Sequence, residues 1–161
     1  MEELAKEYAD RATFLFVYIR EAHPGEVFPH HTSLEQKVRH AQAFRERGLE
    51  RPILLDSLDG EVNRMYGAVS NMSWIIDHTG HVSFRATWTA ADDIRAALDE
   101  TLLIRELRRQ GQGASAYYRE TMGLKPTPQR PEEWLGGQKA IDDFQKFVHK
   151  APVPTSKSKG G

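Results

Sequence analysis

Apolar residues occur along the chain in two patterns: short continuous runs, and stripes in which they are spaced three or four residues apart. Continuous runs are typical of strands that are covered on both faces, and spaced stripes are typical of amphipathic helices. Strands are expected at 13–19, 52–56, 72–77 and 82–87, and helices at 2–10, 33–47, about 60–66 and about 90–110. The last two strands form a hairpin because only a tight connection separates them. This order predicts an α/β domain with parallel strands joined by right-handed crossovers.

The helix expected at 33–47 has signals at both ends. At its start, either Thr32 with Glu35 or Ser33 with Gln36 can form a capping box that satisfies free backbone N–H groups. At its end, Gly48 suits the left-handed conformation that terminates many helices. The side chains expected to face the core are Leu34, Val38, Ala41 and Phe44.

The composition of the chain changes after Gly111. Residues 125–137 are rich in Pro and Gly and predict a loop, and residues 138–148 have the apolar spacing of a short helix. Residues 150–161 are mostly Pro, Ser, Lys and Gly, a composition that buries too little apolar surface to fold. We therefore expect a folded domain at 1–110, a helical and loop extension at 111–149, and a disordered tail at 150–161.

The composition also excludes several classes of function. A net charge of −1 over 161 residues gives no electrostatic basis for binding nucleic acid or an anionic membrane. No apolar run approaches the roughly 18–20 residues that span a bilayer, and the charged N-terminal helix does not resemble a signal peptide, so a cytoplasmic location is expected. The chain has no cysteine, which excludes disulfides, thiolate metal sites and thiol catalysis by these residues. No metal ion or cofactor is expected.

Glu21 and His23 follow directly after the first predicted strand. Open α/β sheets place their chemistry beyond the carboxyl ends of their strands. Because alternate residues of an extended chain point to one side, this carboxylate and imidazole can share a site and act as acid or base near neutral pH. The alternative is that both side chains only anchor the turn before Pro24.

Several other polar and aromatic side chains could have either a functional or a purely structural role. His30 and His31 precede a helix start, where the helix N-terminus favours an anion such as a phenolate, or they are solvated loop residues. Trp74 could line a pocket for an aromatic ligand or pack in the core. Asp56 ends the second strand, and we expect it to cap the turn into the next helix rather than to take part in chemistry.

The segment Phe14–His23 resembles the strand and Glu-Ala-His motif of the iodothyronine deiodinases and their bacterial deiodinase-like relatives. The similarity continues at 31–34, 54–56, 65–68 and 74–85; it covers about residues 1–100 and not 111–161. It implies a thioredoxin-like fold and reductive removal of iodide from an iodinated phenol, in which a selenocysteine or cysteine attacks the halogen and a thiol partner regenerates it. It also implies that Glu21 and His23 form a hydrogen-bonding pair in the active site, and that His31 donates a proton or contacts the phenol.

The chain departs from this family in ways that bear on function. The similarity begins inside the family's first helix, so we expect an N-terminally shortened, three-layer thioredoxin-like sandwich that lacks its first strand and the redox residue. Ser70 stands where the family usually has a cis-proline. Arg85 lies in the region of a substrate-clamping arginine, in a different motif, and together with His30 and Trp74 it forms the expected substrate-binding set.

The missing strand leaves two strands without a neighbour, one at 13–19 and the other at 72–77 or 52–56. They are expected either to pair directly or to accept a strand from a second copy or from the tail, because unpaired backbone groups are costly to bury. The resemblance implies an oxidoreductase by lineage, acting in reductive dehalogenation or thiol redox chemistry, that is inactive alone. The alternative is a non-catalytic binding or assembly module that uses the remaining cleft and the C-terminal extension. The expected partners are a small aromatic or phenolic ligand and a homodimer mate or strand-donating chain.

Overall fold

Helices and strands follow the predicted order in a computed structural model that describes residues 1–114, 137–139 and 141–142. The elements are α1 (Glu2–Glu7), β1 (Phe16–Tyr18), α2 (Leu34–Glu46), β2 (Ile53–Leu55), α3 (Glu61–Met65), β3 (Ser73–Ile76), β4 (Val82–Ala86) and α4 (Ala91–Arg109). The tail expected at 150–161 and most of the extension expected at 111–149 lie outside the described residues. Within the described part of the chain, no helix is both long and apolar enough to cross a membrane.

The described residues of 1–19 and 33–124 form one compact unit, and those of 20–32 and 125–161 form a second. The first unit contains all the helices and strands named above. The second contains the loop that follows β1 and the helical residues 138–139 and 141–142.

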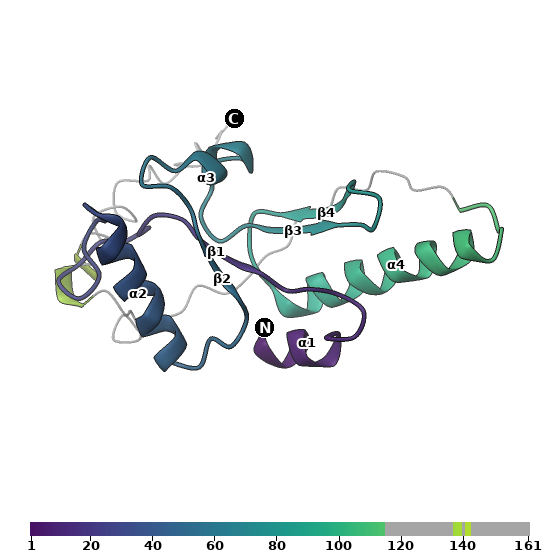
Figure 1. Cartoon of the computed structure of the whole chain (residues 1–161), viewed down its shortest axis with the longest axis horizontal. Helices are drawn as coiled ribbons and strands as arrows, with labels where there is room; N and C mark the ends of the chain where they lie inside the picture. Colours follow the sequence, from purple (N-terminus) through teal and green to yellow (C-terminus); the bar gives the residue numbers. More distant parts are fainter. Residues whose placement is uncertain (115–136, 140, 143–161) are drawn as a thin grey trace, which may run out of the picture. The chain divides into compact units, whose positions relative to one another are not determined.

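β1 and β2 form a parallel pair connected through α2 (Figure 1). Phe44 of α2 packs edge-on against Phe16 and Tyr18 of β1, with ring centroids 5.9 and 5.2 Å apart. The other face of the pair carries the register partners Val17 and Leu54, which are 38% and 47% exposed. We expected both faces of these strands to be covered, and this expectation is wrong. α2 covers the face that carries Phe16 and Tyr18, and the face with Val17 and Leu54 stays exposed.

β3 and β4 form the predicted antiparallel hairpin, which lies along α4 (Figure 1). The turn between them is organised by Asp77, whose carboxylate accepts hydrogen bonds from the N–H and hydroxyl of Thr79 and from the N–H of His81. Ile75 and Phe84 are register partners and pack against the core that α4 helps to form. The helix thus covers one face of the hairpin.

The apolar core of the first unit lies between its first and last helices. Leu4 and Tyr8 of α1 pack against Ile94 and Leu98 of α4, and all four side chains are buried. The spacing of four residues within each pair places both side chains on one helical face. A short N-terminal helix is therefore an integral part of the domain.

α1 also holds the segment that leads into β2. The Glu2 carboxylate accepts hydrogen bonds from the backbone N–H groups of Glu50 and Arg51 and from the Arg51 guanidinium, the last at 2.7 Å. On the opposite side, the Tyr8 hydroxyl donates to Asp99 of α4 at 2.6 Å. One helix thus connects the β1–β2 half of this unit to the β3–β4 half.

The two strand pairs are separate two-stranded sheets among the described residues. Direct pairing was one of the expected outcomes. The strands at 13–19 and 52–56 do pair, as β1 and β2, whereas those at 13–19 and 72–77 are not paired among the described residues. Each pair already packs one face against its own helix, and α1 joins the two halves through side chains rather than through a strand ladder. The mixture of helix with parallel and antiparallel strands supports the predicted α/β class at this coarse level.

The predicted ends of α2 are confirmed. Ser33 is the N-cap, and its hydroxyl accepts a hydrogen bond from the Gln36 N–H at 3.2 Å. Gly48 follows the last turn with a φ of +92°, and the Leu49 N–H donates to the Phe44 carbonyl at 3.1 Å. These bonds satisfy groups that would otherwise be free at a helix end.

The predicted inward face of α2 is only half right. Ala41 and Phe44 face the core as expected, but Leu34 is 52% exposed and Val38 is 37% exposed. Lys37 occupies the inward position instead and is 1% exposed. The helix tolerates this because the Lys37 ammonium reaches backbone carbonyl oxygens, so its charge is not left unpaired.

Candidate functional site

Two of the predicted catalytic side chains, Glu21 and His31, lie together in the loop at 20–32. The His31 Nε2 and Glu21 Oε1 atoms are 4.0 Å apart, and the two side chains are only 5% and 15% exposed. This separation is too long for a direct hydrogen bond between these atoms, but it allows an ion pair when the imidazole is protonated. The arrangement can hold or transfer a proton at the Nε2 atom.

The loop that carries this pair has no regular secondary structure, as predicted from its prolines. Its middle is a turn in which the Gly25 N–H donates to the Phe28 carbonyl at 3.1 Å, and the Phe28 side chain is buried. His23, the third predicted catalytic residue, is half-buried in the same loop. His30 is exposed, which agrees with its reading as a solvated loop residue.

The predicted substrate-binding residues Trp74 and Arg85 contact each other on the hairpin of the first unit. They are register partners, and the Arg85 guanidinium lies 5.5 Å from the centre of the Trp74 ring. Tyr66, which follows α3, packs edge-on against the same ring at 5.3 Å. The indole Nε1 is buried and has no hydrogen-bond partner among the described residues. A cation beside aromatic rings suits an aromatic or anionic ligand as well as it suits packing, so both readings of Trp74 stay open.

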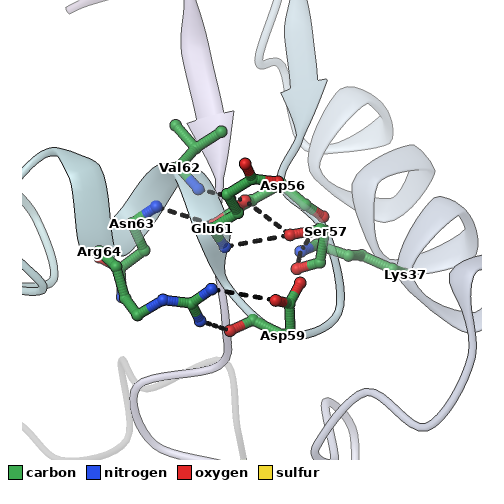
Figure 2. A network of polar contacts seen from close by, with 8 residues as sticks. All are labelled: Lys37, Asp56, Ser57, Asp59, Glu61, Val62, Asn63 and Arg64. Carbon is green, nitrogen blue, oxygen red and sulfur yellow. Dashed lines mark hydrogen bonds and ion pairs between the residues drawn. The ribbon is translucent and has the colours of Figure 1, made fainter.

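A buried charged network lies at the carboxyl end of β2 (Figure 2). The two Asp56 carboxylate oxygens accept hydrogen bonds from the backbone N–H groups of Val62 and Asn63, each at 2.9 Å, so the predicted cap is confirmed. Lys37 lies behind it and donates to the Asp56 carbonyl at 2.6 Å. Both charged side chains are 1% exposed.

These contacts determine how Asp56 titrates. Burial alone would raise the pKa of the Asp56 carboxyl, but hydrogen bonds from Asn63, Val62 and Ser57 and the nearby charge of Lys37 outweigh it, and the pKa is lowered from 3.8. Burial lowers the pKa of Lys37, and the Asp56 carboxylate opposes that shift. Asp56 is therefore ionised at neutral pH, and its carboxylate serves the helix rather than a ligand.

Sequence reasoning missed two members of these clusters, Lys37 and Tyr66. Lys37, Ala41 and Phe44 have the i, i+4, i+7 spacing of one helical face, and this spacing is the signal that could have placed the lysine inward. Tyr66 is an aromatic residue at the end of a short helix, and nothing in its pattern indicates that it meets Trp74.

Residues 1–89 match the family model described as iodothyronine deiodinase. The thyroxine 5-deiodinase of Gallus gallus is 34% identical over 82 residues, which cover 45% of this chain and 32% of that protein. The thyroxine 5-deiodinases of Sparus aurata and Ovis aries are 32% and 30% identical over 84 residues, which cover 47% of this chain and 32% and 29% of those proteins. No solved structure matches the chain significantly.

The chain spans about a third of the length of these curated relatives. The family match nevertheless includes the loop with Glu21 and His31, the capped end of β2, and the hairpin with Trp74 and Arg85. Because it extends over residues 1–89 of 161, which is more than half of the sequence, the chain belongs to the iodothyronine deiodinase family.

Proposed function

We propose that this chain is an oxidoreductase domain by lineage that binds a small iodinated phenol at Glu21 and His31 but does not turn it over alone. The observation that carries the proposal is the shielded pair of Glu21 and His31 in a chain of the deiodinase family that contains no cysteine. In this proposal the fold is a thioredoxin-like sandwich at 1–110 without its first strand. The parallel β1–α2–β2 unit, the hairpin and the closing helix α4 support it.

The reaction of the family separates into a part that these residues can perform and a part that they cannot. Reductive deiodination replaces a C–I bond by a C–H bond, releases iodide, and consumes two electrons and a proton. Glu21, His23 and His31 can bind the phenol and supply the proton, and His30 of the same loop is a proposed further ligand contact. The electrons require a thiol or selenol, which a separate chain would have to provide together with the attacking nucleophile.

The test uses the purified chain and thyroxine, the compound that appears in the names of the matched relatives. Binding of thyroxine and release of iodide are measured separately. We expect saturable binding, which His31→Ala weakens about tenfold to a hundredfold because a hydrogen bond to a charged group is lost. The control is His78→Ala, which removes an exposed histidine at the hairpin tip. No iodide release is expected in excess dithiothreitol. Catalytic iodide release would overturn the proposed inactivity, and equal binding by His31→Ala and the parent chain would overturn the proposed site.

A second function, a non-catalytic assembly module, is favoured by a different observation. The β1–β2 pair exposes Val17 and Leu54, and β1 and β3 are not hydrogen-bonded to each other in the described structure. A strand from a second copy or from another chain could extend either pair, since two-stranded sheets are marginal alone. Sedimentation equilibrium of the parent chain and of Val17→Lys tests the homodimer. A monomer at every concentration would exclude self-association as the assembly mode.

A further inference from the structure

The second compact unit contains a contact that links the candidate-site loop to a distant part of the chain. Both Glu26 carboxylate oxygens accept a hydrogen bond from the backbone N–H of Lys139, at 3.2 and 3.1 Å. The two residues are 113 positions apart in the sequence. Lys139 is the second residue of a helical stretch that begins at Gln138, and the Ile141 N–H donates to the Gly137 carbonyl at 3.3 Å. Glu26 thus binds the free N–H end of this stretch.

Gly137 occupies the position from which a side chain would normally cap such a stretch. Serine, threonine, aspartate and asparagine are preferred there because their side-chain oxygen accepts one of the first N–H groups. Glycine has no such oxygen, and Glu26 supplies it from another segment. A carboxylate is well suited to this role because helix N-termini carry partial positive charge.

A side chain at position 137 would displace the Glu26 carboxylate. A Cβ atom added to Gly137 would lie 2.8 Å from Glu26 Oε2 and 3.1 Å from its Cδ. The φ of Gly137 is +83°, a conformation that side chains disfavour. The carboxylate and the glycine therefore fit each other closely, and either one can be changed to test the contact.

Glu26 lies midway along the loop, five residues after Glu21 and five before His31. The family match ends at residue 89, so the partner segment at 137–142 lies outside the part of the chain that the family shares. We propose that Glu26 is a positioning residue, a latch through which the segment at 137–142 holds the loop that carries Glu21 and His31. The latch itself depends only on these contacts, whereas its effect on a ligand rests on the proposed function.

The experiment measures backbone amide exchange across residues 20–32 in the full chain. Glu26→Ala should accelerate exchange in this loop on the order of fivefold, the effect expected from loss of one helix cap. Gly137→Ala should accelerate the same loop amides, because the added methyl displaces the carboxylate. The double variant should be no faster in the loop than Glu26→Ala, since the two changes break one contact. Glu3→Ala and Gly113→Ala are matched controls: Glu3 is exposed, and a Cβ at Gly113 would meet nothing within 4 Å.

Two further measurements separate the latch from the proposed function. The ring chemical shifts of His31 should change in Glu26→Ala and stay unchanged in the controls, while the urea midpoint of the first unit stays the same. A faster loop with weaker thyroxine binding supports both ideas. A faster loop with unchanged binding keeps the latch and overturns the proposed ligand site. Loop exchange at the parent rate in both Glu26→Ala and Gly137→Ala overturns the latch.

Discussion

Replacing Asp56 by alanine tests how strongly the cap at the end of β2 stabilises the first unit. The change removes the acceptor of two backbone N–H groups at 2.9 Å, whereas the Asp56 carbonyl that accepts from Lys37 stays in place. Hydrogen bonds to a charged group contribute about 1.5–3 kcal/mol each. The two bonds share one carboxylate and their contributions do not simply add, so we expect the free energy of unfolding to fall by about 3–5 kcal/mol.

The assay is urea unfolding at pH 7, followed by circular dichroism and tryptophan fluorescence. With a urea m-value of roughly 2 kcal/mol/M, the midpoint should fall by about 2 M. The control is Asp59→Ala, which removes an exposed ion pair with Arg64 from the same connection and should shift the midpoint far less. Equal midpoints for the two variants would refute the reasoning.

The stability of the chain at low pH gives a second check of the Asp56 cap. The pKa of Asp56 is lower in the folded chain than its usual 3.8, so its stabilising effect is complete above that value and is lost as the pH falls through the folded pKa. The parent chain should therefore lose stability below about pH 4 more steeply than Asp56→Ala does.

Three further predictions concern the turns and the N-terminal helix. The Thr79 hydroxyl and the His81 N–H, followed by the Thr79 N–H and the charge of His78, lower the pKa of Asp77 to about 2. The Thr79 amide resonance should therefore stay constant down to about pH 4 and titrate near pH 2. A titration midpoint close to 3.8 would contradict the hydrogen bonds of this turn. Ala68 has a φ of 58°, so Ala68→Gly should raise the urea midpoint by the equivalent of about 0.5–1 kcal/mol, and a lower midpoint would show that its backbone is unstrained. Leu4→Ala should cost about 2–5 kcal/mol in the same assay, because Leu4 is buried against α4, and a loss below 1 kcal/mol would show that α1 is not part of the core.

The order of the elements could be predicted from the sequence because each element carries its own signal. Ser33 and Gly48 mark the ends of α2, and the runs before and after residues 78–81 mark a hairpin. The inward face of α2 could not be predicted from residue type alone. Lys37 is buried because its ammonium finds a carbonyl that belongs to another element, and a periodicity count treats every lysine as polar.

Strand neighbours and loop geometry depended on contacts that no local pattern contains. An apolar run predicts a strand but does not name the strand beside it, so the separation of β1–β2 from β3–β4 had to come from the structure. Glu21 and His31 could be nominated from their place in the chain. Their approach to 4.0 Å depends on a loop whose conformation involves Phe28 burial and the contact of Glu26 with a segment more than a hundred residues away.

The docking of α1 onto α4 has a consequence for synthesis on the ribosome. Tyr8 and its partner Asp99 are 91 positions apart, whereas the β3–β4 hairpin is closed by neighbours within the chain. Translation at 5–20 residues per second therefore leaves the apolar face of α1 without its partner for roughly 5–20 s after it is made. During that interval Leu4 and Tyr8 are available to chaperones or to other nascent chains. The apolar face of α1 is thus covered only once α4 has been synthesised.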